Sequence, residues 1–377
     1  MTNNYLKLDI KNQIFLPEIS FATGGELLLN QLGINFKIIQ LADISPWEFA
    51  HYLAIENWLT EYQPQPDASY LEQVRGYLEA FHHLCELSDW KKASQILFIN
   101  NNYNHKALHE ELGNCGYYGE QIELYTKLLN KLNGDLDYIL LHGLGWVHYN
   151  LGQPQIAIDY QQKLLDLACK NHNRKAQAQA KGGLGRIYFW CLNKLDIALE
   201  HYQEQLKIAC EIGDQKQQIE ALDGLANVYT IIGKYQKSIQ YCQQALIIAS
   251  RIKEVEMEVT ISATLGTTYR LMGQPDKGLK IFQQILDASD KISDRRQEWS
   301  ILHNIGSIYC TLNQHQNAIE YLEKALKIIQ EIGDKLGESH TLAAIGATYA
   351  RSGQYDNAIG YLKCRMNAPV TAQLNGG

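Results

Sequence analysis

Histidines at helical spacing are the first residues in this sequence that could do chemistry. His105 and His109 stand four positions apart, which would place both imidazoles on one face of a helix, and His82 and His83 are adjacent. A zinc ion in a protein takes three or four protein ligands, and no third ligand stands near either pair. The sequence therefore predicts no metal site.

Short motifs for enzyme catalysis are missing from the sequence. It contains no Gly-x-Ser-x-Gly, no Gly-x-x-x-x-Gly-Lys and no pair of histidines with a glutamate between them. These patterns expose a nucleophilic serine, cradle a phosphate, or hold a zinc ion beside its general base. We therefore expect no catalytic residue, no cofactor and no enzyme activity.

The eight cysteines are scattered along the chain. No two of them stand in a Cys-x-x-Cys pair, so the spacing fits neither a zinc cluster nor a dithiol redox motif. We expect them to be reduced, half-buried apolar residues: Cys85, Cys115, Cys169, Cys191, Cys210, Cys242, Cys310 and Cys364.

Composition and charge narrow the class of protein. The hydrophobic content of 46% and the charged content of 20% exclude a disordered chain. A formal net charge of -7 argues against a nucleic-acid binder. The sequence has no apolar run of about 18 residues and no secretory leader at Met1, so we expect a cytoplasmic protein without membrane insertion.

Six segments of the sequence share one pattern in one register. Each has a small residue, here called the anchor, followed three positions later by an aromatic residue. The pairs are Gly145 and His148, Gly185 and Tyr188, Ala226 and Tyr229, Gly266 and Tyr269, Gly306 and Tyr309, and Gly346 and Tyr349. Successive anchors lie 40, 41, 40, 40 and 40 residues apart, and the step of 41 reflects a one-residue insertion after Tyr188.

The repeated positions have physical roles in a helix, a turn and a second helix. A small anchor lets two helices approach closely, and the tyrosine one turn later fills the gap between them. A Gly or Asn seven positions after the anchor is suited to the left-handed conformation that ends the first helix. Oxygen-bearing residues that suit the start of each following first helix recur every 40 or 41 positions: Asn173, Asp214, Glu254, Asp294 and Asp334.

The tandem pattern small-x-x-Tyr-x-x-x-Gly-x-x-x-x-Ala resembles the tetratricopeptide repeat. Its 40-residue period is similar to that of the longer repeats in Pins-type polarity adaptors and kinesin light chains. The resemblance covers residues 139–366, which are 228 of the 377 residues. It implies an all-α fold, a right-handed superhelical solenoid of antiparallel helix pairs; HEAT-like helix pairs are the alternative.

The rest of the chain departs from this pattern. Degenerate copies with anchors at Phe81 and His109 indicate helical repeats over residues 67–136, ahead of the six repeats in 137–366 and a flexible tail in 367–377. Residues 1–66 would form a cap or head of no assigned family. In that segment Ser45, Pro46 and Glu48 predict a capped helix from Pro46 to about Tyr62. The apolar runs at residues 5–10 and 36–41 would form one or two strands, or a cap on the first repeat.

The resemblance also implies a concave groove lined by the first helix of each pair. Groove side chains would lie six and three positions before the anchor and one, four and five after it. These positions hold His142, Trp146, Tyr149, Asn150, Gln179, Arg186, Phe189, Trp190, Glu220, Asp223, Asn227, Thr230, Thr260, Thr267, Arg270, Ser300, His303, Ser307, His340 and Arg351. The tyrosines Tyr188, Tyr229, Tyr269, Tyr309 and Tyr349 would instead be structural.

Two parts of this groove suggest what it binds. Large rings at Trp146, Tyr149, Phe189 and Trp190 favour a peptide-binding surface, unless the insertion after Tyr188 turns Phe189 and Trp190 into the core. Glu220 and Asp223 would favour a ligand that carries Lys or Arg, although solvated helix charges explain them equally well.

A clamp for a C-terminal carboxylate, which some members of the family use, would be incomplete in this chain. Asn227 fits one of its positions, but Asn150 and Arg186 stand elsewhere in the pattern and no lysine completes the set.

These features predict an adaptor or scaffold that binds a peptide or helix of a partner protein. The alternative is a peptide-responsive regulator or sensor module in which residues 1–66 act as an effector head. The last helix loses its apolar stripe after Leu362 and no polar capping helix follows it, so we expect another copy of the chain or a partner to cover that end, or the chain to be part of a longer protein.

Overall fold

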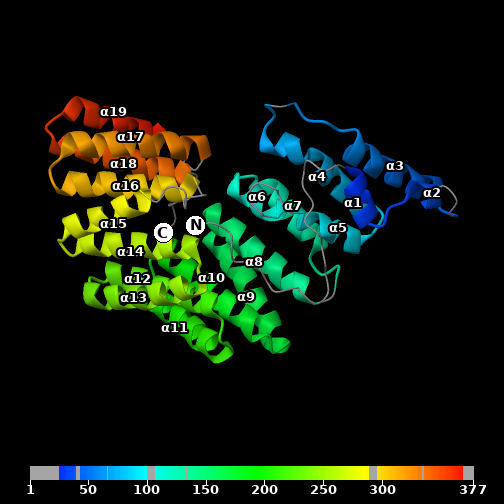
Figure 1. Cartoon of the computed structure of the whole chain (residues 1–377), viewed down its shortest axis with the longest axis horizontal. Helices are drawn as coiled ribbons and strands as arrows, with labels where there is room; N and C mark the ends of the chain where they lie inside the picture. The colour runs from blue at the N-terminus through cyan, green and yellow to red at the C-terminus, as the bar shows by residue number, and fades with distance from the viewer. Residues whose placement is uncertain are drawn as a thin grey trace, which may run out of the picture. The chain divides into compact units, whose positions relative to one another are not determined.

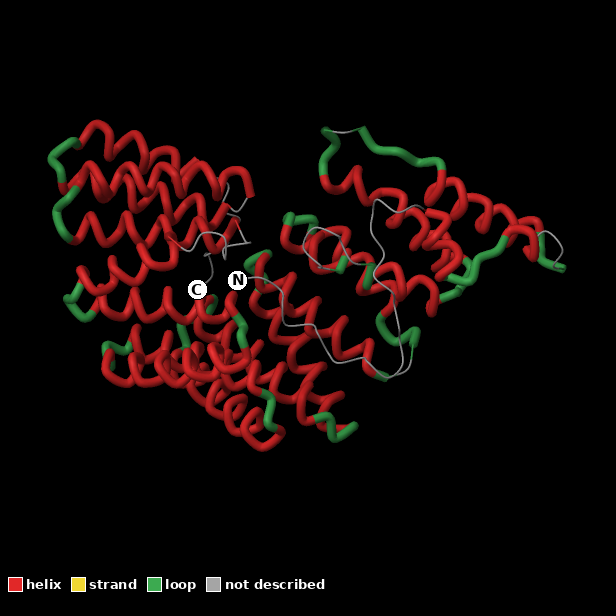
Figure 2. The backbone as a smooth tube through the Cα atoms, in the orientation of Figure 1, coloured by secondary structure: helices red, strands yellow, loops and turns green. Residues whose placement is uncertain are grey.

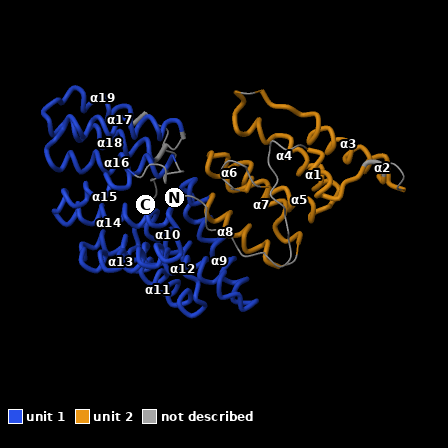
Figure 3. Tube along the Cα trace, viewed as in Figure 1, with its two compact units in different colours: residues 1, 148–377 blue, residues 2–147 orange. Residues whose placement is uncertain are grey.

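The computed structural model describes residues 25–39, 43–65, 67–99, 107–132, 134–287, 295–332 and 335–367. Every extended regular element in these residues is an α-helix, and short loops join successive helices (Figure 1, Figure 2). The predicted all-α fold of helix pairs is therefore confirmed. The chain divides into two compact units, residues 2–147 and residues 148–377 (Figure 3), which are described separately.

The N-terminal unit, residues 2–147, contains helices of unequal length. They are α1 (Gly25–Gln31), α2 (Phe36–Ile39), α3 (Pro46–Thr60), α4 (Tyr70–Glu86), α5 (Trp90–Leu97), α6 (Leu108–Asn114), α7 (Tyr118–Leu128) and α8 (Asp135–Asn150), whose last turn crosses into the second unit. Helix α3 packs on α1 and α4, and α5 packs on α4, α6 and α7. The predicted anchors Phe81 and His109 are buried in this unit.

The start of α3 follows the sequence closely. The Ser45 side chain accepts a hydrogen bond from the Glu48 backbone amide at 3.2 Å, and the Glu48 carboxylate accepts one from the Ser45 amide at 2.8 Å. This capping box confirms the predicted helix from Pro46, which ends at Thr60.

The strand considered for residues 36–41 is wrong. Residues 36–39 form helix α2, because the amides of Ile38 and Ile39 both donate to the Asn35 carbonyl and close a helical turn. The run at residues 5–10 lies outside the described residues.

The C-terminal unit, residues 148–377, is a row of helix pairs. Its helices are α9 (Pro154–Lys170), α10 (Arg174–Trp190), α11 (Leu195–Ile212), α12 (Gln215–Ile231), α13 (Tyr235–Ile252), α14 (Val255–Leu271), α15 (Pro275–Asp287), α16 (Arg295–Thr311), α17 (His315–Ile332), α18 (Lys335–Arg351) and α19 (Tyr355–Asn367). From α9 to α19, successive helices pack on one another (Figure 1). The first helix of a pair is called the A helix and the second the B helix, so α10, α12, α14, α16 and α18 are A helices.

Consecutive A helices also contact one another, from α10 with α12 through to α16 with α18. The B helices have no comparable mutual contacts among the described residues. Because the A helices lie closer together, they form the inner wall of this unit.

Turns between the two helices of a pair use the predicted residues. Seven positions after the anchor, Gly233 has a φ of 81° and Asn313 a φ of 58°, which confirms the left-handed conformation expected there. At the start of A helices, Asn173 accepts from the Ala176 amide at 3.0 Å and Asp214 from the Gln217 amide at 3.1 Å. Glu254 makes no such cap bond, and Asp294 and Asp334 lie outside the described residues.

Glycines of neighbouring A helices hold a ring of the B helix between them. The Tyr202 ring of α11 is so close that a Cβ added at Gly185 of α10 would lie 3.0 Å from it. A Cβ added at Gly224 of α12 would lie only 2.4 Å from the same ring. These two positions therefore need glycine because of the close approach of the helices.

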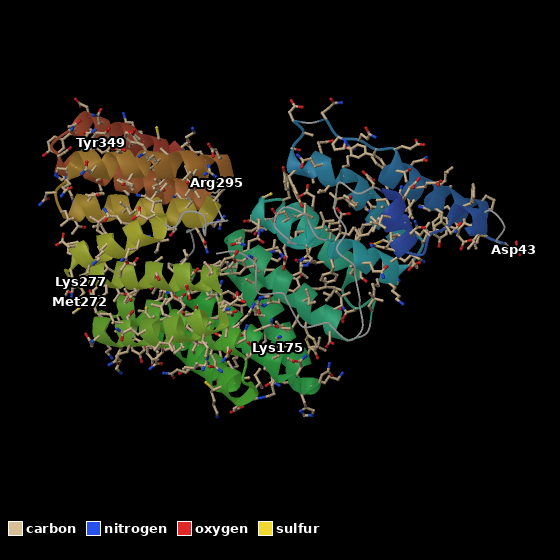
Figure 4. The ribbon with its side chains drawn as sticks, viewed as in Figure 1. Asp43, Lys175, Met272, Lys277, Arg295 and Tyr349 are labelled. Carbon is tan, nitrogen blue, oxygen red and sulfur yellow. The ribbon has the colours of Figure 1, made fainter. Side chains whose placement is uncertain are left out.

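The aromatic residue three positions after the anchor stacks on a ring of its own B helix. The ring centroids are 5.5 Å apart in each of the pairs His148 and Tyr160, Tyr188 and His201, Tyr229 and Tyr241, Tyr309 and Tyr321, and Tyr349 and Tyr361. In the remaining repeat the B-helix residue is Ile281, and Lys277 lies over the Tyr269 ring at 5.4 Å instead. Tyr349 and Lys277 are labelled in Figure 4.

Three hydroxyl groups form a buried ring between α12, α13 and α14. The Thr230 oxygen lies 2.7 Å from that of Ser238 and 2.8 Å from that of Thr268, and Ser238 and Thr268 are 3.0 Å apart. Both threonines donate to carbonyls of their own helices, so Ser238 supplies the proton within the ring. Ser238 stands where other repeats have Ala318 or Ala358.

The last helix has an apolar face that nothing described covers. Ile359 of α19 is 50% exposed, whereas the equivalent Ile319 of α17, which is followed by α18, is 5% exposed. Tyr355 and Leu362 extend the exposed stripe along one side of α19.

Candidate functional site

An acidic pair on α12 is the most unusual feature of the inner wall. Glu220 and Asp223 are one turn apart, and both side chains are only partly exposed. The Asp223 carboxylate accepts from the Thr264 hydroxyl of α14 at 2.8 Å and from the Asn227 amide at 3.1 Å. The next A helix therefore helps to fix the position of Asp223.

Two glutamines donate hydrogen bonds to Glu220. Its carboxylate accepts from the Gln217 side-chain amide at 3.1 Å and from that of Gln205 at 3.4 Å. Gln205 is buried, comes from the B helix α11 and also donates to Gln217 at 2.9 Å. Three helix-borne polar groups thus converge on one side of the wall.

Burial changes the charge state of this pair. Loss of solvent raises the pKa of Glu220 to about 8 and that of Asp223 to about 6, and the Arg186 guanidinium of α10 opposes both shifts. At neutral pH Glu220 is therefore mostly protonated and Asp223 mostly ionised. A cation brought beside the pair would favour loss of the Glu220 proton.

Gln205 and Gln217 were not among the predicted groove residues. In the sequence, the adjacent glycines Gly182 and Gly183 of α10 were the feature that could have indicated a buried side chain such as Gln205. A Cβ at Gly182 would lie 2.5 Å from the Gln205 side chain, and one at Gly183 would lie 2.6 Å from that of Gln161. The two glycines make room for two buried glutamines, one on each neighbouring B helix.

The inner wall becomes basic after α12. Arg270 of α14 lies beside His303 of α16, and His340 of α18 adds a further basic group next to His303. Burial, together with the charges of His340 and Arg270, lowers the pKa of His303 to about 4. Arg351 is exposed, and its guanidinium lies 3.8 Å from the Cys310 sulfur.

The predicted aromatic patch is divided by burial. Phe189 is 6% exposed and packs with Tyr202, Leu225 and Tyr229 in the core, so its assignment to the groove surface is wrong. Trp190 is 52% exposed, and its ring meets that of Phe189 edge to face at 4.6 Å between centroids.

The other predicted residues at this end of the array are all partly buried. His142 and Trp146 belong to the N-terminal unit, and Tyr149 and Asn150 to the C-terminal unit.

The histidines considered for metal binding have other partners. His109 is buried, and its Nδ1 lies 2.8 Å from the Tyr125 hydroxyl. His83 Nδ1 lies 2.9 Å from His51 Nδ1, and His82 contacts Glu123 at 3.3 Å. His105 lies outside the described residues, and no group of three or more His, Cys, Asp and Glu in the described part of the chain could hold a metal ion.

Hydropathy gives one further finding. None of the helices in the described ranges combines the length and the apolar character needed to cross a bilayer.

Solved structures with a similar fold share little sequence with this chain. A Rap conjugation gene regulator of the plasmid pLS20, solved with the Phr* peptide, is 14% identical, with 93% of this chain and 96% of that one aligned and a TM-score of 0.59. The apo form of RapI is 14% identical, with 69% and 94% aligned and a TM-score of 0.55. A Rap protein complexed with Competence and Sporulation Factor is 12% identical, with 79% and 97% aligned and a TM-score of 0.54. At these identities the likeness concerns the fold alone.

The sequence itself has one family match. No curated protein matches it, but a family model described as tetratricopeptide repeat matches residues 217–291 and 300–368. The matched residues cover the helix pairs from α12 to α19. By this match, the helix pairs from α12 to α19 are tetratricopeptide repeats.

Proposed function

We propose that this chain is a non-catalytic scaffold that binds a peptide segment of a partner protein along the inner wall of the C-terminal unit. The observation that carries the proposal is the acidic pair of Glu220 and Asp223. Burial raises the pKa of both carboxyl groups, and the Arg186 guanidinium does not offset that rise. A lysine or arginine side chain of the ligand would supply that charge and would bind at Asp223.

The geometry of the pair suits recognition better than simple solvation. A solvated surface carboxylate has no fixed partners, whereas Asp223 is oriented by Thr264 and Asn227. Preorganised acceptors lose less entropy when a ligand binds. The peptide complexes named above support the same use of a similar fold.

Trp190 is the second element of the proposed surface. Its ring is 52% exposed next to the buried Phe189, which limits its motion on one side. Exposed tryptophans with a fixed base are frequent anchors in protein interfaces. We therefore keep Trp190, and not Phe189, as the aromatic contact.

Positional-scanning peptide libraries test the main proposal. Wild type should select Lys or Arg at one position, and Asp223→Asn should lose that selection because the cation has lost its partner. Asp196→Asn changes an exposed aspartate at the start of α11 and serves as the matched control. Selection without a basic residue, or basic selection that survives Asp223→Asn, would contradict the proposal.

A peptide-responsive regulator is the second candidate, with residues 1–66 as its effector head. It is favoured by the likeness to the pLS20 regulator, which extends over 93% of this chain. If it is correct, a selected peptide should change hydrogen exchange in α3 and α4 as well as in α12. Protection confined to α10–α14 would favour the scaffold alone.

Two further proposals concern nucleic acid and a second copy of the chain as partners. The charge of -7 favours a partner other than nucleic acid, and we propose that the chain acts in the cytoplasm. We also propose that the apolar face of α19 pairs with the same face of a second copy. An antiparallel pair would place Asp356 of one copy near the basic end of the other, which carries Lys363 and Arg365.

A further inference from the structure

The side chain of Arg270 is the least compensated charge on the inner wall. Among the described residues it has no hydrogen-bond or ion-pair partner, and its Nε is closed off from solvent. Burial alone lowers the pKa of this guanidinium. The Nε–H group of Arg270 has lost water without gaining an acceptor, which is costly, and the half-buried guanidinium still needs an acceptor.

The groups around Arg270 increase this shortage of negative charge. His303 lies beside it, and the charges that act on His303 are those of His340 and Arg270, both basic. The nearest oxygen contact of the His303 ring is a neutral one, the Thr341 hydroxyl at 3.4 Å from Nδ1. Among the described residues, no carboxylate charge contributes to the pKa shift of Arg270 or of His303.

We propose that Arg270, with His303 and His340, forms a subsite for one carboxylate of the bound peptide. The proposal rests on the proposed function, because it places a second, anionic contact on the same ligand. Guanidinium groups bind carboxylates through two parallel hydrogen bonds, which suits a single buried arginine. A polyanion would need a run of exposed basic side chains, and Arg270 is half-buried.

The distance between the acidic and basic subsites sets a rule for the ligand. Asp223 lies three positions before the anchor of α12, and Arg270 lies four positions after the anchor of α14. Their places along the two A helices therefore differ by seven residues, which is roughly 10 Å in the direction of the helix axis. The axes of adjacent A helices are about 8–10 Å apart, which adds to the separation. The Arg270 side chain points back toward the start of its helix, which reduces the separation. The two groups are then roughly 10–14 Å apart, which an extended peptide spans in about three or four residues.

The carboxylate has two sources, and peptide libraries distinguish them. Libraries of about seven residues would be made in free-acid and amidated forms, with Lys fixed at one position and the others randomised. Wild type should select Asp or Glu, or a free C-terminus, about three or four residues from the lysine. Acid selection that persists in amidated peptides identifies a side-chain carboxylate, and selection confined to free acids identifies the C-terminus.

Variants at Arg270 test the subsite itself. Arg270→Gln should weaken binding of the acid-bearing peptide roughly tenfold or more, while an otherwise identical peptide without the acid keeps its affinity. Arg270→Lys should retain part of the selection, and it replaces Arg270→Gln if that variant unfolds. Arg251→Gln, an exposed change on the B helix α13, should behave as wild type.

The possible failures are distinct. If wild type selects lysine through Asp223 but no acid, or if acid selection survives Arg270→Gln, the subsite is wrong and the proposed function stands. If no library peptide binds to wild type, the proposed function is wrong and this inference falls with it.

Discussion

Replacing Glu220 by glutamine should stabilise the C-terminal unit in alkaline solution and change little in acid. The Glu220 carboxyl has a pKa of about 8 in the fold, against an ordinary value of 4.5. Between these two values the folded chain holds a proton that the unfolded chain has lost. The free energy of unfolding therefore falls as the pH rises through this window, and glutamine removes that loss.

The magnitude follows from the shift. The difference between 4.5 and about 8 would correspond to about 5 kcal/mol at most, because one pKa unit is worth about 1.4 kcal/mol. Glu220 is partly exposed, and water and nearby polar groups screen its charge. We expect about 1–3 kcal/mol of stabilisation at pH 8.5, which raises the melting temperature by roughly 3–10 °C for a unit of this size.

Glutamine is a suitable replacement because the hydrogen bonds survive. Gln205 and Gln217 both donate to the Glu220 side chain, and an amide oxygen accepts as a protonated carboxyl does. Thermal unfolding followed by circular dichroism near pH 5 and pH 8.5 measures the effect. Glu200→Gln, on the exposed face of α11, is the matched control.

The test compares the change in melting temperature caused by Glu220→Gln near pH 5 with the change at pH 8.5. The reasoning is refuted if Glu220→Gln shifts the melting temperature equally at both pH values, or if it destabilises the unit at the higher one. The same result would also remove support for the proposal that the pair of Glu220 and Asp223 binds a lysine or arginine of the ligand.

Three further predictions concern packing and assembly. Gly224→Ala should destabilise the C-terminal unit by about 1–3 kcal/mol in urea, since its Cβ would lie 2.4 Å from a tyrosine ring, whereas Gly360→Ala in open space should stabilise α19 slightly. Ser238→Ala should cost about 0.5–1.5 kcal/mol through the lost hydroxyl proton, and an unchanged urea midpoint would show that the ring contributes nothing. Ile359→Glu should abolish any dimer seen by sedimentation, and Ile247→Glu, which changes a 70% exposed residue on α13, should not.

Features that depend on one backbone position were predictable from the sequence. The turn residues Gly233 and Asn313 act through their own φ angle, and the capping residues Asn173 and Asp214 act on amides two or three positions away. The repeat therefore predicted the helix pairs and their turns. Residues 36–39 were ambiguous because a short apolar run fits a strand as well as a helix.

The state of the candidate site depends on contacts between distant residues. Burial raises the pKa of Glu220, while Arg186 on α10 and a hydrogen bond from Gln205 on α11 oppose that rise, and none of these effects follows from the pattern around Glu220. Phe189 and Trp190 were considered together, but adjacent helical residues point about 100° apart. One of them entered the core and the other remained exposed.

The glycines of α10 have a consequence for the order in which the array opens. Gly182, Gly183 and Gly185 lie within one turn, and each lowers intrinsic helix stability by about 1 kcal/mol relative to alanine. Helix α10 therefore depends on its packing against α9 and α11 more than its neighbours depend on theirs, and its amide protons should exchange early. Arg186 follows these glycines on the same helix, so an opening of α10 withdraws a guanidinium charge that acts on Glu220 and Asp223. A change in the local stability of α10 should therefore also change the affinity of the inner wall for a positively charged ligand.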